Sequence, residues 1–395
     1  MTGNHAIETA PDRVAGRGVD ASADLPRVRF TPGRLLAFVV VAASVALFLY
    51  FVLPRLLGLR ETWNRIDGGD PWWLGLAAGL EVLSFASYMA LLRSAFVRRA
   101  ARVPAASGIR WRESYQITMA SLAATRLFAA AGAGGIALTA WALRRSGLGP
   151  RSVAARMLAL LTLLYGVYMA AFVICGLGLY LGVFSGPDPF AVTVIPAIFG
   201  GLVIGLFLAI ALLPGDLERL VAGRTSAEHW AGRTARWLAA MSATAAVGVR
   251  TAIELVRARD PFLLGAVGWW GFDIAVLWAC FRAFGSAPPP AVIVIAYFVG
   301  MLGNALPLPG GIGGVDGGMI GAFTAFGVGV EVSVVAVLAY RAFAFWLPTL
   351  PGAVAYFQLR RTVQRWHSVP ESVEPSVSLA AGSGAICSSE LPSYT

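Results

Sequence analysis

Long apolar runs separated by short charged clusters dominate this chain. A membrane-spanning helix needs about 20 consecutive apolar residues, and six runs meet that length. A backbone in lipid can satisfy its polar groups within one segment only as a helix, so we expect each run to form one transmembrane helix. The six predicted spans are Leu35–Leu57, Pro71–Leu92, Ser152–Val183, Phe190–Leu213, Pro261–Ala283 and Val332–Gln358.

Two further apolar stretches, Glu113–Leu143 and Ala291–Phe326, are interrupted near their midpoints. Each is short for two spans, and glycine or proline at the interruption weakens a helix. We expect each to form a re-entrant hairpin of two half-helices, which is tolerated at membrane depth where protein buries the break or the break lines a cavity. The expected break residues are Gly132, Gly134 and Gly135 in the first stretch, and Pro307, Pro309, Gly310, Gly311, Gly313 and Gly314 in the second.

Composition supports the membrane class. Apolar residues make up 57% of the chain and charged residues 13%, whereas a soluble domain carries about a quarter charged residues. We therefore expect an all-α polytopic membrane protein. Arginine carries all the basic charge behind the formal net charge of +10. These arginines lie at the ends of apolar runs, which argues against nucleic-acid binding.

The distribution of arginine also predicts the topology. Arginine-rich segments lie on both sides of the first hairpin, and Arg156 belongs to the one that follows it. Arginines also occur throughout the loop Pro214–Asp260 and after the last span. The positive-inside rule places all of them in the cytoplasm. We expect a multi-pass protein of the cytoplasmic membrane with both termini inside. The predicted organisation is a disordered tail over 1–33, a transmembrane domain over 34–361 with an interfacial helix in the loop 214–260, and a disordered tail over 362–395.

On this map the two hairpins enter the membrane from opposite sides. Each has the order helix, glycine break, helix, short loop, span. Opposite insertion of two such units is the arrangement from which many transporters build a site at the membrane midplane, so the units form a candidate inverted repeat. The alternative is two unrelated glycine-rich helix breaks.

Several polar residues fall at membrane depth, where an ionisable side chain is costly and therefore a candidate for function. One interpretation is a polar cavity in which arginine holds an anionic group such as a lipid phosphate, because the planar guanidinium can bind two oxygens at once. The other is that the arginines pair with the acids and only hold helices together. Asn304, matched by Thr125 in the first hairpin, is a further candidate for contact with substrate or backbone. The candidate substrate-binding residues are Arg126, Arg341, Asp316, Asn304, Glu81 and Asp273.

Other chemistry is not expected. The three cysteines and three histidines show no metal-ligand spacing. The glycine runs lack the Lys-Ser/Thr end of a P-loop and do not follow a strand. We expect no metal, nucleotide or other cofactor, and we do not expect an enzyme.

The glycine-rich motifs resemble those of a known family. The second is LPLPGGIGGVDGG over Leu306–Gly318, followed by Ala339–Arg341, and the first combines ATRLF over Ala124–Phe128 with GAGG over Gly132–Gly135. Together they resemble the lysylphosphatidylglycerol synthase transmembrane-region family, also called flippase-like domain proteins, over roughly Leu35 to Arg361. Two positions depart from its pattern. Asp316 stands where the family usually has Glu, and no proline precedes the first glycines.

The resemblance implies lipid movement. Bifunctional members carry a soluble aminoacyl-transferase domain after the membrane part, and we expect this chain to have the lipid-moving half without it. The first hypothesis is a flippase or scramblase-like translocator of an anionic phospholipid or lipid-linked headgroup. The second is a non-transporting subunit that binds phospholipids and scaffolds a separate lipid-modifying or glycan enzyme. A membrane-embedded enzyme acting on a headgroup is a third. The sequence does not predict an oligomeric state.

Overall fold

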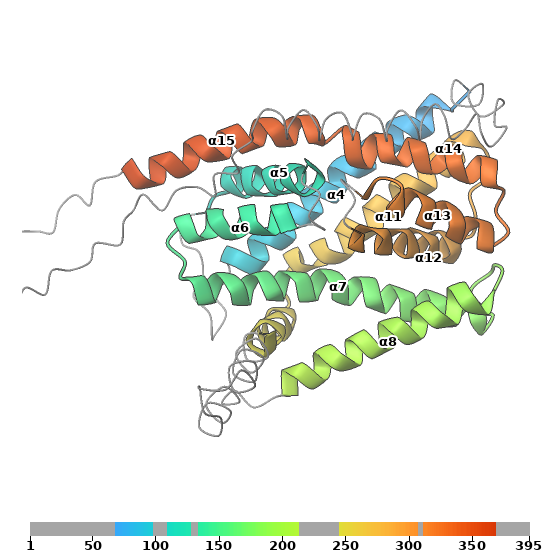
Figure 1. Cartoon of the computed structure of the whole chain (residues 1–395), viewed down its shortest axis with the longest axis horizontal. Helices are drawn as coiled ribbons and strands as arrows, with labels where there is room; N and C mark the ends of the chain where they lie inside the picture. The colour runs from blue at the N-terminus through green and yellow to red at the C-terminus, as the bar shows by residue number, and fades with distance from the viewer. Residues whose placement is uncertain (1–67, 98–108, 128–132, 213–244, 307–310, 369–395) are drawn as a thin grey trace, which may run out of the picture. The chain divides into compact units, whose positions relative to one another are not determined.

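The computed structural model describes residues 68–97, 109–127, 133–212, 245–306 and 311–368 of the chain. All regular structure in these ranges is helical, which confirms the predicted all-α membrane class (Figure 1). The first predicted span, Leu35–Leu57, lies outside the described residues, as do the tail over 1–33 and residues 369–395.

Five helical stretches are long and apolar enough to cross a membrane, at about 1.5 Å of rise per residue. They confirm the other five predicted spans. Four are α4 (Pro71–Val97), α7 (Pro150–Tyr180), α8 (Phe190–Leu212) and the pair formed by η2 (Pro261–Leu264) and α11 (Gly265–Phe284). The fifth runs over Val330–Arg365.

That fifth stretch is not one regular helix, although the sequence predicts a single span over Val332–Gln358. It consists of α14 (Val330–Arg341), a π-helical turn η5 (Ala342–Trp346) and α15 (Thr349–Ser368). The backbone N–H of Leu347 donates a hydrogen bond to the carbonyl of Ala342, five residues back. Pro348 follows at once and has no N–H to continue the ladder, which accounts for the irregularity. α15 also continues past residue 361, where we placed the end of the membrane domain.

The two interrupted stretches form two pairs of short helices. The first pair is α5 (Trp111–Leu127) and α6 (Ala133–Arg145), and the second is α12 (Pro290–Met301) and α13 (Gly314–Ala325), joined through a 3-10 turn, η3 (Leu302–Ala305). The two members of each pair pack on each other. The helix–break–helix pattern is therefore as predicted, and membrane insertion as re-entrant hairpins stays a prediction.

The helices that precede the two pairs, α4 and α11, pack together along their length. A Cβ on Gly265 would lie 2.3 Å from the carbonyl oxygen of Ser87, so only glycine allows this approach. The hydroxyl of Ser84 donates to the carbonyl of Trp269 across the same interface (2.9 Å). Small and hydroxyl side chains are what close helix packing in membranes requires.

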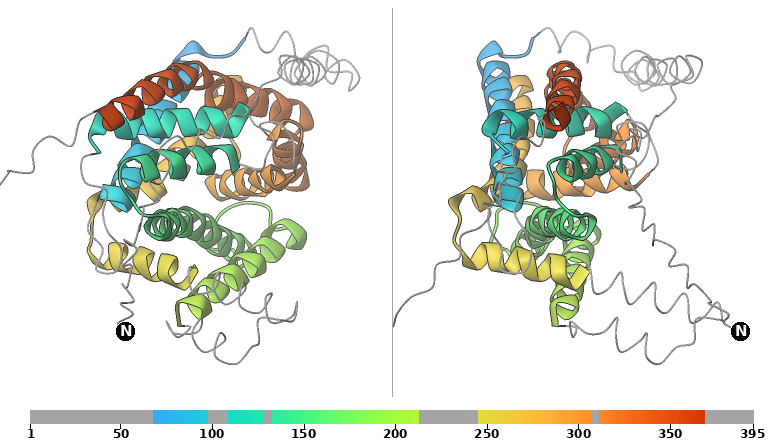
Figure 2. Two further views of the ribbon diagram at one scale, coloured as in Figure 1. Left: turned by 60° about the vertical axis from the view of Figure 1, so that its left-hand side comes forward. Right: turned by 90° about the vertical axis from the view of Figure 1, so that its left-hand side faces the viewer.

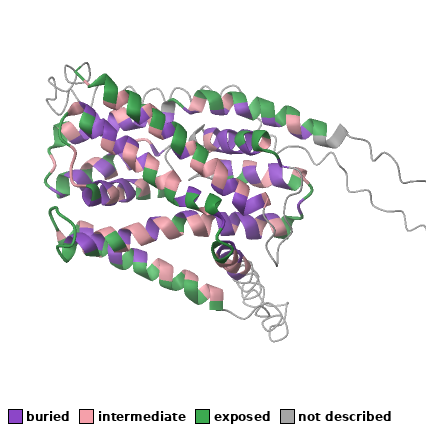
Figure 3. Cartoon of the chain, turned by 180° about the vertical axis from the view of Figure 1, so that it is seen from behind, coloured by how far each residue is buried: buried purple, intermediate pink, exposed green. Residues whose placement is uncertain are grey.

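The outer surface is apolar where lipid is expected to cover it. α8 packs mainly on α7, as Figure 2 shows, and its outer face exposes Leu202, Leu206 and Leu212. In Figure 3 exposed positions run along α8, whereas α12 is mostly buried. A helix over residues 245–257, within the loop where we expect an interfacial helix, packs on α7 through Gly248, which approaches Leu158.

Candidate functional site

The candidate site is built around the start of α13. Gly311 and Gly313 have φ values of +67° and +84°, which favour glycine. A Cβ on Gly311 would also lie 2.5 Å from the side-chain oxygen of Asn304. These glycines turn the chain sharply, as predicted for a break, whereas Gly314 is already the first residue of α13. Pro307, Pro309 and Gly310 lie outside the described residues.

Asp316 lies in the first turn of α13 and is buried. Its Oδ2 accepts a hydrogen bond from the backbone N–H of Gly313 (3.0 Å). A carboxylate at this position satisfies a helix N–H that has no partner within the helix and lies at the positive end of the helix dipole. The glycine break thus fixes where this acid lies.

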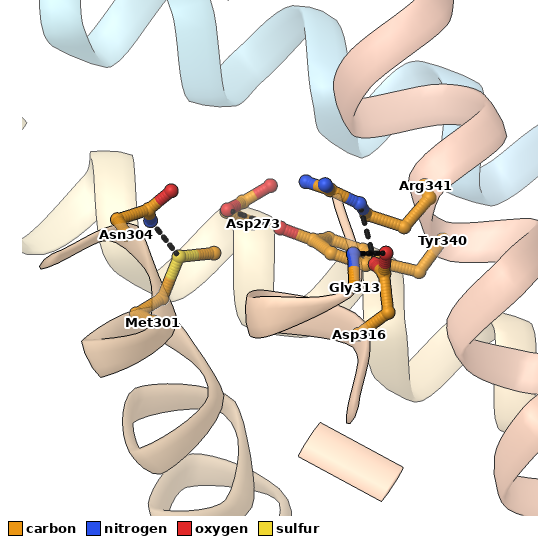
Figure 4. Close-up of polar contacts among 7 residues, drawn as sticks. All are labelled: Asp273, Met301, Asn304, Gly313, Asp316, Tyr340 and Arg341. Atoms are coloured by element: carbon orange, nitrogen blue, oxygen red, sulfur yellow. Dashed lines mark hydrogen bonds and ion pairs between the residues drawn. The ribbon is translucent and has the colours of Figure 1, made fainter. Parts of the chain in front are cut away.

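Arg341 forms a buried ion pair with Asp316, with Nε 2.7 Å from Oδ1 (Figure 4). It is the last residue of α14, immediately before the π-helical turn. Its guanidinium carbon also lies 4.9 Å from the ring centre of Phe345 in that turn. The π-helical turn therefore begins directly after the arginine of the candidate site. Such turns are frequent at functional sites.

Asp273 brings α11 to the same place. Its Oδ2 accepts hydrogen bonds from the hydroxyl of Tyr340 (2.9 Å) and from that of Tyr297. This oxygen therefore uses both of its lone pairs as acceptors. In Figure 4 the terminal nitrogens of Arg341 point toward this carboxylate. Sequence reasoning proposed neither tyrosine as a site residue, although Tyr340 lies within the motif Ala339–Arg341.

Glu81 is the third acid of the cluster. It is buried at the middle of α4 and lies within electrostatic range of Tyr340 and of Cys280. The described part of the site therefore holds three acids and one base, Arg341. If all are ionised, three negative charges and one positive charge give a net charge of −2.

The structure does not place two of the predicted site residues, Asn304 and Arg126, in contact with this cluster. Asn304 is exposed in η3, and its amide nitrogen lies 3.3 Å from the sulfur of Met301. Figure 4 shows it on the side of Asp273 away from Asp316. Arg126 lies in the last turn of α5, and its side chain falls outside the described part of the chain.

The glycines of the first break differ from the prediction. Gly132 lies outside the described residues. Gly134 and Gly135 lie in the first turn of α6 rather than in the break. A Cβ on Gly135 would lie 2.1 Å from the hydroxyl oxygen of Thr125 and 2.6 Å from the carbonyl oxygen of Ser121. This glycine therefore serves close packing between α5 and α6.

A second buried polar group lies elsewhere and was also missed. Arg156, which we counted among the cytoplasmic loop arginines, is fully buried in α7 and donates to the carbonyl of Ala95 near the end of α4. Beside that end, Ser94 donates to Asp260 (2.7 Å), which caps η2 through the N–H of Phe262 (3.1 Å). These contacts satisfy helix ends, so we assign them to structure.

Within the described ranges no cluster of three or more His, Cys, Asp or Glu side chains could hold a metal ion. The printed contacts of the site are an ion pair and hydrogen bonds. Carboxylates, tyrosine hydroxyls and a guanidinium can bind a charged or hydroxylated headgroup.

Comparison with known proteins identifies the same family that the glycine-rich motifs resemble. The family described as the lysylphosphatidylglycerol synthase TM region matches residues 34–352. Two matching relatives are proteins of Methanothermobacter thermautotrophicus strain Delta H, each described as a UPF0104 membrane protein. One is 36% identical over 101 residues, which is 25% of this chain and 29% of the relative. The other is 35% identical over 91 residues, 22% of this chain and 27% of the relative. The match thus spans less than a third of each relative's length.

Proposed function

Since this chain belongs to the lysylphosphatidylglycerol synthase transmembrane-region family, we propose that it moves a phospholipid or lipid-linked headgroup between the leaflets of the cytoplasmic membrane. The observation that carries this proposal is the buried ion pair of Arg341 and Asp316 at the glycine break of α13. Ionisable residues are rare inside membrane helices and commonly mark the path of a substrate.

In the proposed mechanism a headgroup phosphate competes with Asp316 for Arg341. Guanidinium binds phosphate through two parallel hydrogen bonds, which a single contact through Nε does not provide. The start of α13 adds backbone N–H groups that favour an anion. Exchange of the carboxylate for the phosphate would then open the contact between α13 and α14.

The charge of the site makes Arg126 important to this mechanism. The three described acids outnumber Arg341, so an anionic headgroup needs a second positive charge. Arg126 lies in the last turn of α5, the first helix of the other pair, and we propose that it supplies this charge.

The packing of the helices supports an internal repeat around the site. α4 packs on α5 and α7, while α11 packs on α12 and α14. The two units therefore repeat the same contacts, with α4 and α11 packed together between them. Re-entrant insertion from opposite sides, with both termini in the cytoplasm, belongs to the same proposal.

Leaflet exchange in proteoliposomes tests the proposal. We expect fluorescent phosphatidylglycerol to exchange faster with the protein than in empty vesicles, and faster than a zwitterionic phosphatidylcholine. Arg126→Ala and Arg341→Gln should abolish the gain. Arg282→Gln is the matched control, because Arg282 is an exposed arginine beside Trp73 in the last turn of α11.

Equal rates in protein-containing and empty vesicles for several lipids would refute transport. The alternative is then a subunit that binds lipids and scaffolds a separate envelope-lipid or lipid-linked glycan enzyme. The ion pair is compatible with it, because Asp316 already neutralises Arg341 without a ligand. Stable co-purification with such an enzyme, unaffected by Arg126→Ala, would support the scaffold.

A further inference from the structure

One face of α5 carries a row of hydroxyl side chains: Ser114, Thr118, Ser121 and Thr125. Their spacing of four, three and four residues places them above one another on a helix. Ser114 and Thr118 are 0% and 1% exposed, and Ser121 is also buried. α5 is therefore a buried helix with a polar stripe on one side.

The C-terminal half of this row faces α6. The hydroxyls of Ser121 and Thr139 lie 2.7 Å apart, so one donates to the other across the two helices. Thr125 donates to the carbonyl of Ser121 (2.9 Å). The close approach of Gly135 brings the α6 backbone against the same two residues.

The N-terminal half of the row differs, because the hydroxyls of Ser114 and Thr118 have no hydrogen-bond partner among the described residues. A helical serine or threonine can ordinarily bond the carbonyl four residues back. Ser87, Thr193 and Ser333 do so in other helices of this chain.

Burying a hydroxyl without a hydrogen bond is costly, because the group gives up its bonds to water and gains no partner. Two such groups, one helical turn apart on the same face, therefore point to a polar ligand between them and the surface. The row begins beside an exposed charged end, where Arg110, Trp111 and Arg112 are all exposed. A buried water typically makes about three hydrogen bonds and is the usual partner of such groups.

We propose that the hydroxyl row of α5 lines a narrow hydrated path, which leads from the charged N-terminal end of α5 toward its C-terminal end. Water is the ligand, held in single file by Ser114, Thr118 and Ser121. The proposal does not depend on lipid movement. In a translocator, the path would hydrate the headgroup side of the first hairpin.

Cysteine accessibility in proteoliposomes of the full chain tests this path. The native cysteines are first replaced (Cys175→Ala, Cys280→Ala, Cys387→Ser). Ser114→Cys, Thr118→Cys and Ser121→Cys then each place a thiol on the row. Silver ion, which is small enough to follow water in single file and binds thiolate, is added. Modification is followed by mass, as the loss of later labelling of the denatured protein with N-ethylmaleimide.

Ile117→Cys and Ala120→Cys are the matched controls, because both residues are 0% exposed on other faces of the same helix. Only a hydrated thiol ionises readily and reacts. We expect the row to react at least about tenfold faster than the controls, the effect of one pKa unit on the thiolate fraction.

The order along the helix distinguishes a path from fraying at the helix end. Ser121→Cys lies deeper than Ile117→Cys, so faster reaction of the deeper position supports a path along one face. Rates that fall with depth on all faces, or rates equal to the controls, would overturn the proposal. If Ser114→Cys does not fold, Thr118→Cys and Ser121→Cys carry the same comparison, and retention volume on size exclusion identifies the folded variants.

Discussion

At the scale of single residues, Arg341 and Asp316 stabilise each other because both charged groups are largely shielded from water. Each is at most 10% exposed in its side chain. Removing one partner leaves the other charge buried and uncompensated, which typically costs about 3–5 kcal/mol. Removing both charges together avoids much of that cost, so the two substitutions should not be additive.

We therefore expect Arg341→Gln to lower the apparent midpoint of thermal unfolding in detergent strongly, and Asp316→Asn to lower it as well. The double variant should be more stable than the sum of the single effects predicts. Arg282→Gln, which removes an exposed arginine, should leave the midpoint nearly unchanged. Additive losses would show that the two side chains do not stabilise each other.

The sequence was sufficient to find most charged members of this site. Glu81, Asp273, Asp316 and Arg341 stand out because each interrupts an apolar run. Their partners did not stand out, since Tyr297 and Tyr340 are aromatic residues that suit an apolar core equally well. Arg156 was misplaced for a related reason: an arginine near the start of a span looks like a loop residue until the packing of α4 buries it.

At the scale of elements, the packing of α5 on α6 depends on one missing side chain. Gly135→Ala would place a carbon 2.6 Å from the carbonyl oxygen of Ser121, a backbone atom that cannot rotate away. We expect this variant to separate the two helices and to lose much of its folded yield and thermal stability, by the mechanism of overpacking.

Gly79→Ala is the control for that substitution. Gly79 also lies in a helix, and a Cβ there meets nothing within 4 Å. Alanine favours a helix over glycine by about 0.5–1 kcal/mol, so the control should be as stable as the parent or slightly more stable. Equal stability of both variants would mean that α5 and α6 do not pack as closely as the structure has them.

Hydropathy predicted where the helices lie more reliably than where a helical stretch is interrupted. Runs of apolar residues marked α4, α7, α8 and α11 within a few residues, because length and apolarity together decide whether a helix can span. The same criterion joined α14 and α15 into one span, since it gives no weight to Pro348. It also placed Gly134 and Gly135 in the break, because glycine weakens a helix and serves close packing alike.

At the scale of the whole molecule, the contact between α5 and α15 joins the two candidate repeat units. The hydroxyl of Thr362 in α15 donates to the side-chain oxygen of Gln116 in α5 (2.9 Å). Two cysteines at these positions lie within reach of a short bifunctional methanethiosulfonate, which joins them through two disulfides. A control contact joins α7 to α8, the helix that follows it, where the ring centres of Tyr180 and Phe190 lie 6.2 Å apart.

Cross-links at these two contacts distinguish a need for motion between the two units from a general need for flexibility. If transport requires the first hairpin to move against the second unit, cross-linking Gln116→Cys to Thr362→Cys should abolish most leaflet exchange in a background without native cysteines. Reduction should restore it, because the cross-link is the only difference. Cross-linking Tyr180→Cys to Phe190→Cys should leave exchange largely intact, since α7 and α8 can move together. Full exchange in the protein cross-linked between Gln116→Cys and Thr362→Cys would refute alternating motion of the hairpin, whereas loss in both cross-linked proteins would place the required motion in α7 and α8 as well.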